Sequence, residues 1–191
     1  MNAGCTISKM DKVRKKLEDI IQKRQMAHIS FVNPEMSNLN GFPLRLGSRL
    51  LLFQFIYDFH FDGYYIVDIS SIKAIRSNKY ERFFEKMLDA EGMIEHIADP
   101  ECCGIQDWES ALRSLNSTGE NIIVEWMDDG ELVFFIGKVA RFNKNYASFR
   151  QFDAVGKWIA SWPIPYDNIV DIQFRNKYIN IFSKYVKPYK P

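Results

Sequence analysis

The sequence predicts an α+β protein, mostly β, built from two consecutive small units that share one plan. The first observation is an internal repeat, because the pattern N-K-Y-x-x-x-F-x-K begins at Asn78 and again at Asn176. The second is an aromatic content of 15% in 191 residues, since aromatic side chains pack well on the pleated surface of strands. The third is a regular succession of short apolar runs separated by turn residues.

Further matches in the same order extend the repeat. Gly41 begins a segment that parallels the one at Gly137, Phe53 falls opposite Phe149, and Ser71–Ile75 parallels Asn168–Ile172. Two long units fit a duplicated small domain better than a solenoid of many short repeats. We therefore predict these boundaries: unit one over 8–90, a linker over 91–104, unit two over 105–186 and a tail over 187–191.

Unit one is predicted to begin with a helix over 11–26, where apolar residues recur at spacings of three and four. Ser8 and Asp11 resemble a capping box at its start. Turn residues such as Gly47-Ser48 and Asp62-Gly63 separate the apolar runs that follow. We expect strands over 27–32, 41–46, 50–57, 64–69 and 72–75, and a closing helix over 78–88.

Unit two repeats this order. A helix over 107–115 is followed by Gly119, the residue type that commonly stands just past a helix end. Asp129-Gly130 is typical of a tight hairpin turn. We expect strands over 121–127, 132–142, 146–153, 156–162 and 169–174, and a closing helix over 178–185. The predicted linker contains Gly92 and Asp99-Pro100, as domain boundaries often do.

Two segments in each unit carry a family resemblance. The segments 41–57 and 137–153 each combine a glycine-containing strand, a turn and an apolar strand. The segments 62–75 and 156–172 each combine a strand, a short break and a strand of the form Ile-x-x-Ile. After a helix, this outline resembles the Sm-like (Hfq-like) small β-barrel, and in tandem it resembles uncharacterised bacterial proteins with two such domains. The resemblance implies two five-stranded, strongly bent barrels, each with an N-terminal and a closing helix.

The resemblance also bears on ligands. Sm-like domains commonly associate through strand edges, so it implies a protein partner or self-association. Family members that bind RNA carry an asparagine in the turn between the first two strands of that outline. Asn143 and Asn145 stand there in unit two, whereas Gly47-Ser48-Arg49 stands there in unit one.

Charge and hydropathy limit the classes of partner. Lys and Arg total 25 and Asp and Glu total 24, so the chain lacks the basic excess of proteins that coat DNA. The most apolar run, Leu50–Tyr57, is far shorter than the roughly 20 residues that span a bilayer. The first ten residues lack the apolar core of a signal peptide. We expect a soluble cytoplasmic protein that does not bind membranes.

Cysteine and histidine spacing argues against a local metal site. The three cysteines are odd in number and two of them, Cys102 and Cys103, are adjacent, which favours free thiols in a reducing compartment. We expect no cofactor. The weak metal candidates are Asp58, His60 and Asp62, whose period-two spacing would place them on one face of a strand. The alternative is the polar side of an edge strand or turn.

No nucleophile, phosphate-loop or zinc-protease motif is present, so we do not expect an enzyme. Aromatic rings beside cations can stack the bases of single strands. The candidates for such a surface are Asn143, Asn145, Arg150, Lys157, Trp158 and Trp162. Core packing with ordinary surface charge is the alternative explanation for them.

Three functions remain open from the sequence. The first is a non-catalytic module that binds or assembles with a protein partner or another copy of itself. The second is binding of single-stranded RNA or another nucleic acid through loops of unit two. The third is an enzyme whose site lies between the two units.

Overall fold

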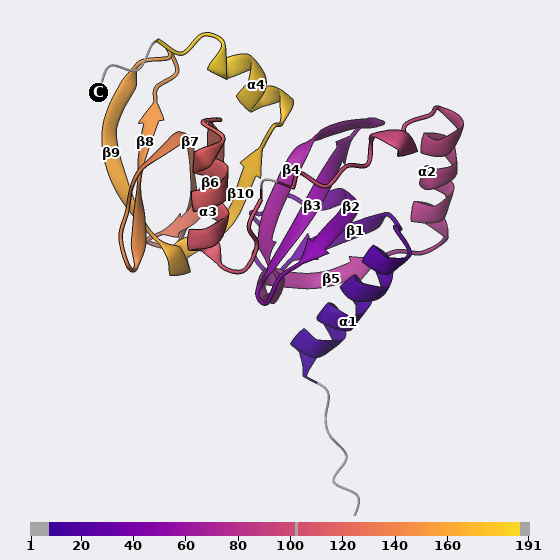
Figure 1. The fold of residues 1–191 in the computed structure, drawn as a ribbon. Helices are drawn as coiled ribbons and strands as arrows, with labels where there is room; N and C mark the ends of the chain where they lie inside the picture. Colours follow the sequence, from indigo (N-terminus) through magenta and orange to yellow (C-terminus); the bar gives the residue numbers. More distant parts are fainter. Residues whose placement is uncertain (1–7, 102, 188–191) are drawn as a thin grey trace, which may run out of the picture.

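The computed structural model describes residues 8–101 and 103–187. Within them the strands form one antiparallel ten-stranded sheet, in the order β5-β1-β2-β3-β4-β10-β6-β7-β8-β9. Figure 1 shows this sheet as two curved halves side by side, joined where β4 meets β10. The mostly β composition predicted from the sequence is confirmed.

The N-terminal half begins with a helix and ends with a helix, as predicted. Its first helix starts at a capping box, in which the N–H of Asp11 donates to Oγ of Ser8 over 3.1 Å and the N–H of Ser8 donates to the Asp11 carboxylate. The half contains α1 (Lys9–Gln22), β1 (Ala27–Phe31), β2 (Leu39–Leu46), β3 (Leu50–Tyr57), β4 (His60–Asp68), the 3₁₀ helix η1 (Ile69–Ser71), β5 (Ile72–Arg76) and α2 (Lys79–Ala90).

The C-terminal half follows the same order of elements. Asp129 and Gly130 both have positive φ in the hairpin that joins its first two strands, as an Asp-Gly turn of this kind requires. The half contains α3 (Trp108–Ser117), β6 (Ile122–Asp128), β7 (Glu131–Phe142), β8 (Tyr146–Phe152), β9 (Trp158–Pro165), η3 (Tyr166–Asn168), β10 (Ile169–Phe174) and α4 (Lys177–Ser183). The 3₁₀ helix η2 (Ile94–His96) lies between the halves in sequence.

The prediction of two closed five-stranded Sm-like barrels is wrong. Closure would require the last strand of each half to return to the fourth strand of the same half. Instead β5 pairs with β1 alone among the described strands, and β4 pairs with β10 of the other half. The sheet is therefore open, with β5 and β9 at its two outer edges. Strand patterns in the sequence specify which residues are extended, but they do not specify which edge takes which partner.

The segment predicted as a linker packs against the N-terminal half. Gln54 on β3 donates to the carbonyl of His96 and accepts from the N–H of Ala98, both over 3.0 Å. Arg45 on β2 forms an ion pair with Asp99 at 2.7 Å and also donates to the carbonyl of Cys103. The side chain of Cys103 is buried. Cys5 and Cys102, the other two cysteines, lie outside the described residues.

The central strands are buried on both faces. On β3, Leu51 and Phe53 belong to the core under α1, whereas Leu50 and Leu52 belong to a second core under α3. This double burial explains why the strand is a continuous apolar run instead of an alternating one. No helix in the described part of the chain is both long and apolar enough to cross a membrane.

Candidate functional site

The joint between the halves is an antiparallel strand pair. Across it Val67 pairs with Asp171 and Tyr65 pairs with Gln173. At the start of β4, the carboxylate of Asp62 accepts from the backbone N–H of Lys177 over 2.5 Å, so β4 also holds the first turn of α4. The joint thus combines a strand ladder with a side-chain contact from one half to the other.

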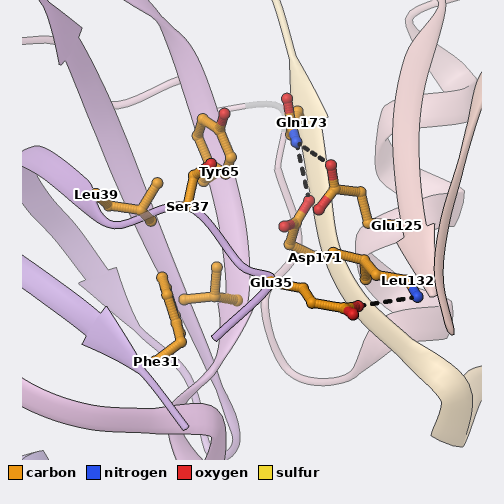
Figure 2. A pocket seen from close by; sticks show the side chains of 10 residues that line it. Phe31, Glu35, Ser37, Leu39, Tyr65, Glu125, Leu132, Asp171 and Gln173 are labelled. Carbon is orange, nitrogen blue, oxygen red and sulfur yellow. Dashed lines mark hydrogen bonds between the residues drawn. The ribbon is translucent and has the colours of Figure 1, made fainter. Parts of the chain in front are cut away.

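One face of this joint encloses a cavity of about 220 Å³ between the halves (Figure 2). Its polar lining converges from both sides, because Glu35 and Tyr65 come from the N-terminal half while Glu125, Asp171 and Gln173 come from the C-terminal half. The carboxylate of Glu35 accepts from the N–H of Leu132 over 3.3 Å, which adds a hydrogen bond between the halves. The remaining lining residues are Phe31, Ser37, Leu39 and Val67.

A buried carboxyl pair dominates the chemistry of the cavity. Asp171 is only 3% exposed and lies opposite Glu125 on the neighbouring strand. The amide of Gln173 donates to both carboxyl groups over 3.3 Å. Burial raises the pKa of Asp171, and the nearby charge of Glu125 raises it further. Burial likewise raises the pKa of Glu125.

These shifts imply that the pair retains a proton above the usual range of carboxylic acids. No lysine, arginine or histidine occurs among the described residues that line the cavity. The negative charge of the pair is therefore reduced by binding a proton instead of by a cationic side chain. A retained proton lets one carboxyl donate to the other, which is a stable arrangement for two acids in contact. The described lining also holds no cysteine or histidine to act as a nucleophile or base.

Sequence reasoning missed Asp171 and Glu125. Neither belongs to a recognisable motif, and they become neighbours only because β6 pairs with β10. The available signal was an acidic residue, Asp171, inside the largely apolar strand predicted over 169–174.

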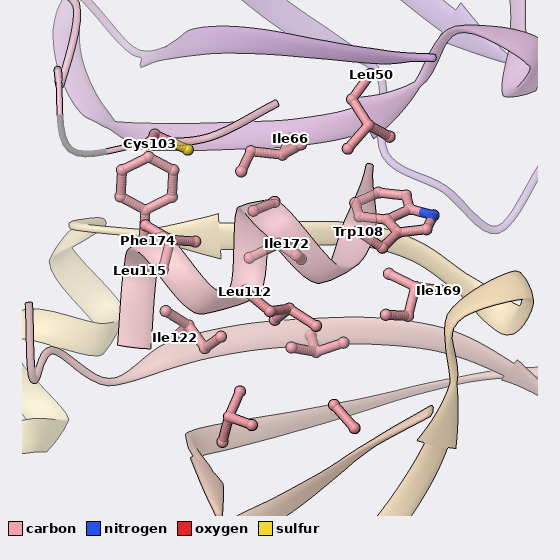
Figure 3. Close-up of a cluster of buried hydrophobic side chains, with 14 of the residues drawn as sticks. Leu50, Ile66, Cys103, Trp108, Leu112, Leu115, Ile122, Ile169, Ile172 and Phe174 are labelled. Atoms are coloured by element: carbon pink, nitrogen blue, oxygen red, sulfur yellow. The ribbon is translucent and has the colours of Figure 1, made fainter. Parts of the chain in front are cut away.

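The opposite face of the joint is apolar and fully covered. Ile172 and Phe174 point away from the cavity, into a core that α3 covers through residues such as Trp108 and Leu112. Figure 3 shows Leu50 and Ile66 of the N-terminal half entering the same core. The joint is therefore a buried part of the sheet and is held from both faces.

The two outer edges of the sheet are exposed. On β5, the side chains of Lys73, Ala74 and Arg76 face solvent. Nζ of Lys16 on α1 donates to the carbonyl of Ile75 on this strand over 2.6 Å. Lysine side chains are common along natural sheet edges.

The edge at β9 has a different character. The strand is exposed over most of its length, with Ile164 as its buried residue. Pro163 and Pro165 have no N–H to offer to a neighbouring strand, which is why prolines in sheets occur mainly on edge strands and at bulges. Trp162 is 52% exposed on this strand.

The structure brings together some of the predicted nucleic-acid residues. Arg150 and Trp158 line a surface cavity of about 260 Å³ together with Lys138, which pairs with Arg150 across β7 and β8. Lys157 lies just before β9, where its backbone N–H donates to Asp153.

The other predicted residues lie elsewhere. Trp162 pairs with Phe149 and Trp158 pairs with Phe152, and these two phenylalanines occupy opposite faces of β8, so the two tryptophans do too. A β-bulge between the two pairs causes the reversal. Asn143 and Asn145 lie in the turn at the far end of β8. They are distant from Trp158.

The three weak metal candidates do not all lie on one strand. Asp58 lies in the turn between β3 and β4 with φ +41°, His60 begins β4, and Asp62 accepts from the N–H of Lys177. The described residues include no group of three histidine, cysteine or acidic side chains placed to hold a metal ion. Phe59, between Asp58 and His60, is 46% exposed and stacks on Phe84.

Comparison of the chain with protein-family models, with curated proteins and with solved structures gives no match. Function is therefore inferred from the geometry of the chain itself.

Proposed function

We propose that the protein is a non-catalytic assembly module that pairs the β9 edge of one copy with the β5 edge of the next. The observation that carries the proposal is the joint between β4 and β10 inside the chain. In the sheet order, β9 holds the position in the C-terminal half that β4 holds in the N-terminal half, and β5 corresponds to β10. The chain therefore already contains one example of the contact that its two free edges could make.

Corresponding residues give the expected register. Phe53 pairs with Tyr65 and Phe149 pairs with Trp162, so Trp162 corresponds to Tyr65. Gln173 directly follows the second isoleucine of the repeated Ile-x-x-Ile strand in one half, and Arg76 directly follows it in the other.

The register predicts one cross-copy pair in particular. Tyr65 faces Gln173 at the existing joint, so Trp162 of one copy would face Arg76 of the next. Both side chains are exposed to about half their area, Trp162 at 52% and Arg76 at 50%. A guanidinium beside an indole ring is a favourable cation–π combination. The contact is thus chemically complementary as well as equivalent in position.

Pro163 has no backbone N–H, and this is compatible with the proposed pairing. In the same register Pro163 corresponds to Ile66, which faces Ile172 at the joint, so it would face Ile75 of the next copy. Proline cannot donate to the carbonyl of Ile75, but Nζ of Lys16 already does so. Another partner strand, whose carbonyl at this position had no other donor, would leave that carbonyl without a hydrogen bond. Pro163 would therefore make the β9 edge selective for β5 over such strands.

The contact would be heterologous, because two different surfaces meet. Such a contact repeats until it closes into a ring or grows as an open chain. The proposal therefore predicts assemblies larger than a dimer at high protein concentration.

Cysteine cross-linking tests the register. A chain with Arg76→Cys is mixed with a chain with Trp162→Cys, both carrying Cys5→Ser and Cys102→Ser. We expect a disulfide-linked dimer in the mixture at ~100 μM protein, a concentration at which a micromolar contact is occupied. The matched control replaces Arg76→Cys by Lys73→Cys, which lies too far along β5 for a disulfide with Trp162→Cys. Equal yields from both mixtures, or no dimer from either, would contradict the proposal.

A second candidate function is binding of single-stranded nucleic acid. The observation that favours it is the cavity that brings Trp158, Arg150 and Lys138 together on one face of the sheet. Fluorescence anisotropy with a labelled single-stranded RNA tests it, with binding expected to weaken steeply as salt rises. Arg150→Gln should weaken binding if this face is the site, and Asn143→Ala should not, because it lies at the other end of β8. Salt-insensitive or undetectable binding would exclude this function.

A further inference from the structure

The two halves differ in polarity where the sheet faces their closing helices, α2 and α4. In the N-terminal half His28 pairs with Asn40 across β1 and β2. In the C-terminal half Ile123 pairs with Ile136 across β6 and β7. Asn40 and Ile136 each directly precede the glycine at which the repeated segment begins, so the two pairs correspond. A polar pair therefore stands in one half where the other half has an apolar pair.

The closing helices carry a third difference of the same kind. Glu81 on α2 and Ile179 on α4 each follow the Asn-Lys-Tyr start of the repeated motif, and both side chains are buried. Ile179 packs with Ile123 and Ile136 in one small core. Glu81 instead forms an ion pair with Arg76 at 2.7 Å. Because taking polar groups out of water costs free energy, three such replacements in one place indicate a use other than core packing.

The polar residues of the N-terminal half adjoin a cavity of about 320 Å³ between the sheet and α2. Met26 and Ile56 contribute buried apolar surface to it. Phe59, Tyr80 and Phe84 contribute three aromatic rings. Apolar and aromatic walls with a few polar groups are typical of pockets for small molecules, which begin at about 300 Å³.

A strained turn holds one of these rings at the cavity. Asp58 and Phe59 join β3 to β4 with φ +41° and +63°. Phenylalanine rarely adopts positive φ, because its Cβ then crowds the backbone. The ring of Phe59 stacks on that of Phe84, with centroids 4.6 Å apart. Strain of this kind is concentrated at functional sites, and here it places a ring and a carboxylate at the cavity.

The charges around the cavity favour a neutral ligand. Asp58 and Glu81 supply two carboxylates and Arg76 supplies one guanidinium, so an anion would meet an excess of negative charge. A cation would find the ring of Tyr80 already flanked, since Nζ of Lys79 lies 5.2 Å and the guanidinium of Arg76 lies 6.0 Å from its centre. A flat neutral ring can stack on the aromatic side chains without either cost.

The amide of Asn40 indicates which flat ring fits. Its Oδ1 lies 2.8 Å from Nδ1 of His28, and this contact orients the amide. The same oxygen has a second lone pair, and Nδ2 can donate. An asparagine amide that offers both groups recognises adenine, because it accepts from the N6 amino group and donates to N7.

We propose that this cavity binds an adenine ring, with Asn40 contacting its N6 and N7 atoms and Phe59 and Tyr80 providing aromatic walls. The site is built from the N-terminal half alone, so the inference does not depend on the pairing of copies. Adenine could come from a free nucleoside or from a base of a single strand. The shared chemistry is the ring, and the experiments below distinguish the two sources.

Calorimetric titration with related nucleosides tests the assignment to adenine. Inosine carries an oxygen in place of the N6 amino group, and 7-deazaadenosine lacks N7. We expect each of them to bind about fivefold or more weakly than adenosine, because each breaks one bond of the contact with Asn40. Equal affinities for all of these nucleosides, or no binding of adenosine at ~1 mM, would overturn the proposal.

Two substitutions with matched controls test the location of the site. Asn40→Ile introduces the residue type of the C-terminal half, and it should weaken adenosine binding about tenfold and abolish the preference over inosine. Its control is Asn116→Ile on the exposed face of α3. Tyr80→Ala removes an exposed ring and should weaken binding about tenfold. Its control is Tyr178→Ala, at the corresponding position of the repeated motif on α4.

Both controls should bind adenosine as the natural chain does, and circular dichroism confirms that each variant is folded. Unchanged affinity in both Asn40→Ile and Tyr80→Ala would overturn the proposal. An equal loss in Tyr80→Ala and Tyr178→Ala would overturn it as well, because the ring would then not be bound in the N-terminal half.

A further titration distinguishes the source of the ring. Adenosine is compared with a short oligoadenylate, and an oligouridylate of the same length is the control. Tighter binding of the oligoadenylate, lost in Asn40→Ile, would support the site and identify a single strand as the source. Tighter binding of adenosine would support the site and identify a free nucleoside. An oligouridylate that binds as tightly as adenosine would overturn the proposal.

Discussion

Asp171 and Glu125 lie opposite each other on β10 and β6, and a single amide, that of Gln173, donates to both carboxyl groups. The corresponding pair in the N-terminal half is Ala74 and Ser30, which face each other on β5 and β1. The acidic pair therefore occurs where the sheet continues into the other half, and small neutral residues occur at the free edge. Two ionised acids at the free edge would lose their hydration when an incoming strand buried them, which is unfavourable unless the pair retained a proton.

The carboxyl pair should make stability depend on pH. Since the folded pKa of Asp171 is raised, its contribution is fully present below the unfolded pKa of about 4 and is lost as pH rises through the folded value. Asp171→Asn should therefore gain stability relative to the natural chain as pH rises from 5 to 8, by about 1 kcal/mol or more. Urea unfolding at several pH values measures this, with Asp167→Asn on the surface as the control. Parallel curves for Asp171→Asn and the natural chain would show that the pair is not protonated.

Gly63 should be far more sensitive to substitution than other glycines of positive φ. Gly63→Ala adds backbone strain of about 1 kcal/mol and also a Cβ within 2.5 Å of the β10 backbone. Gly92→Ala is the matched control, because Gly92 has φ +68° and nothing within 4 Å of its added Cβ. We expect Gly63→Ala to lower the free energy of unfolding by at least ~2 kcal/mol more than Gly92→Ala. Similar losses of unfolding free energy for the two variants would mean that the backbones of β4 and β10 move apart to accommodate the added Cβ at little cost.

The core under α3 should couple the two halves energetically. Ile66 of the N-terminal half is fully buried in it, so Ile66→Ala should cost about 2–5 kcal/mol. Ile181 on α4 is 46% exposed, and Ile181→Ala should cost well under 1 kcal/mol by comparison. Both losses are measured by chemical denaturation. If Ile66→Ala produces two separate transitions, the halves unfold independently and the shared core does not couple them.

Lys16 should matter for assembly more than for folding. Lys16→Met keeps an unbranched side chain on α1 but removes the donor to the carbonyl of Ile75. The isolated chain should lose about 1 kcal/mol or less, because water can replace an exposed donor. The cross-linked dimer should fall several-fold, since that carbonyl would then face Pro163 of the other copy without a donor. An unchanged dimer yield would show that the hydrogen bond from Lys16 to the carbonyl of Ile75 does not contribute to the contact between copies.

Local elements were predictable because their signals are contiguous in the chain. Ser8 and Asp11 mark the start of α1, and Asp129-Gly130 marks a hairpin, because capping and turn geometry depend only on neighbouring residues. The candidate site was not predictable in this way. The separation of Trp158 from Trp162 onto opposite faces depends on a β-bulge, which the alternation of residue types does not reveal.

The sequence by itself determined the order and type of the elements, since the repeat at Asn78 and Asn176 returns as two halves with the same succession of helix, strands and helix. Only the tertiary structure decided that β4 takes β10 as its partner, which opens the predicted barrels into one sheet and brings Asp171 into a cavity between the halves. The physical reason is that a strand edge presents the same backbone groups to every candidate partner. The choice among partners therefore depends on side-chain packing over the whole joint.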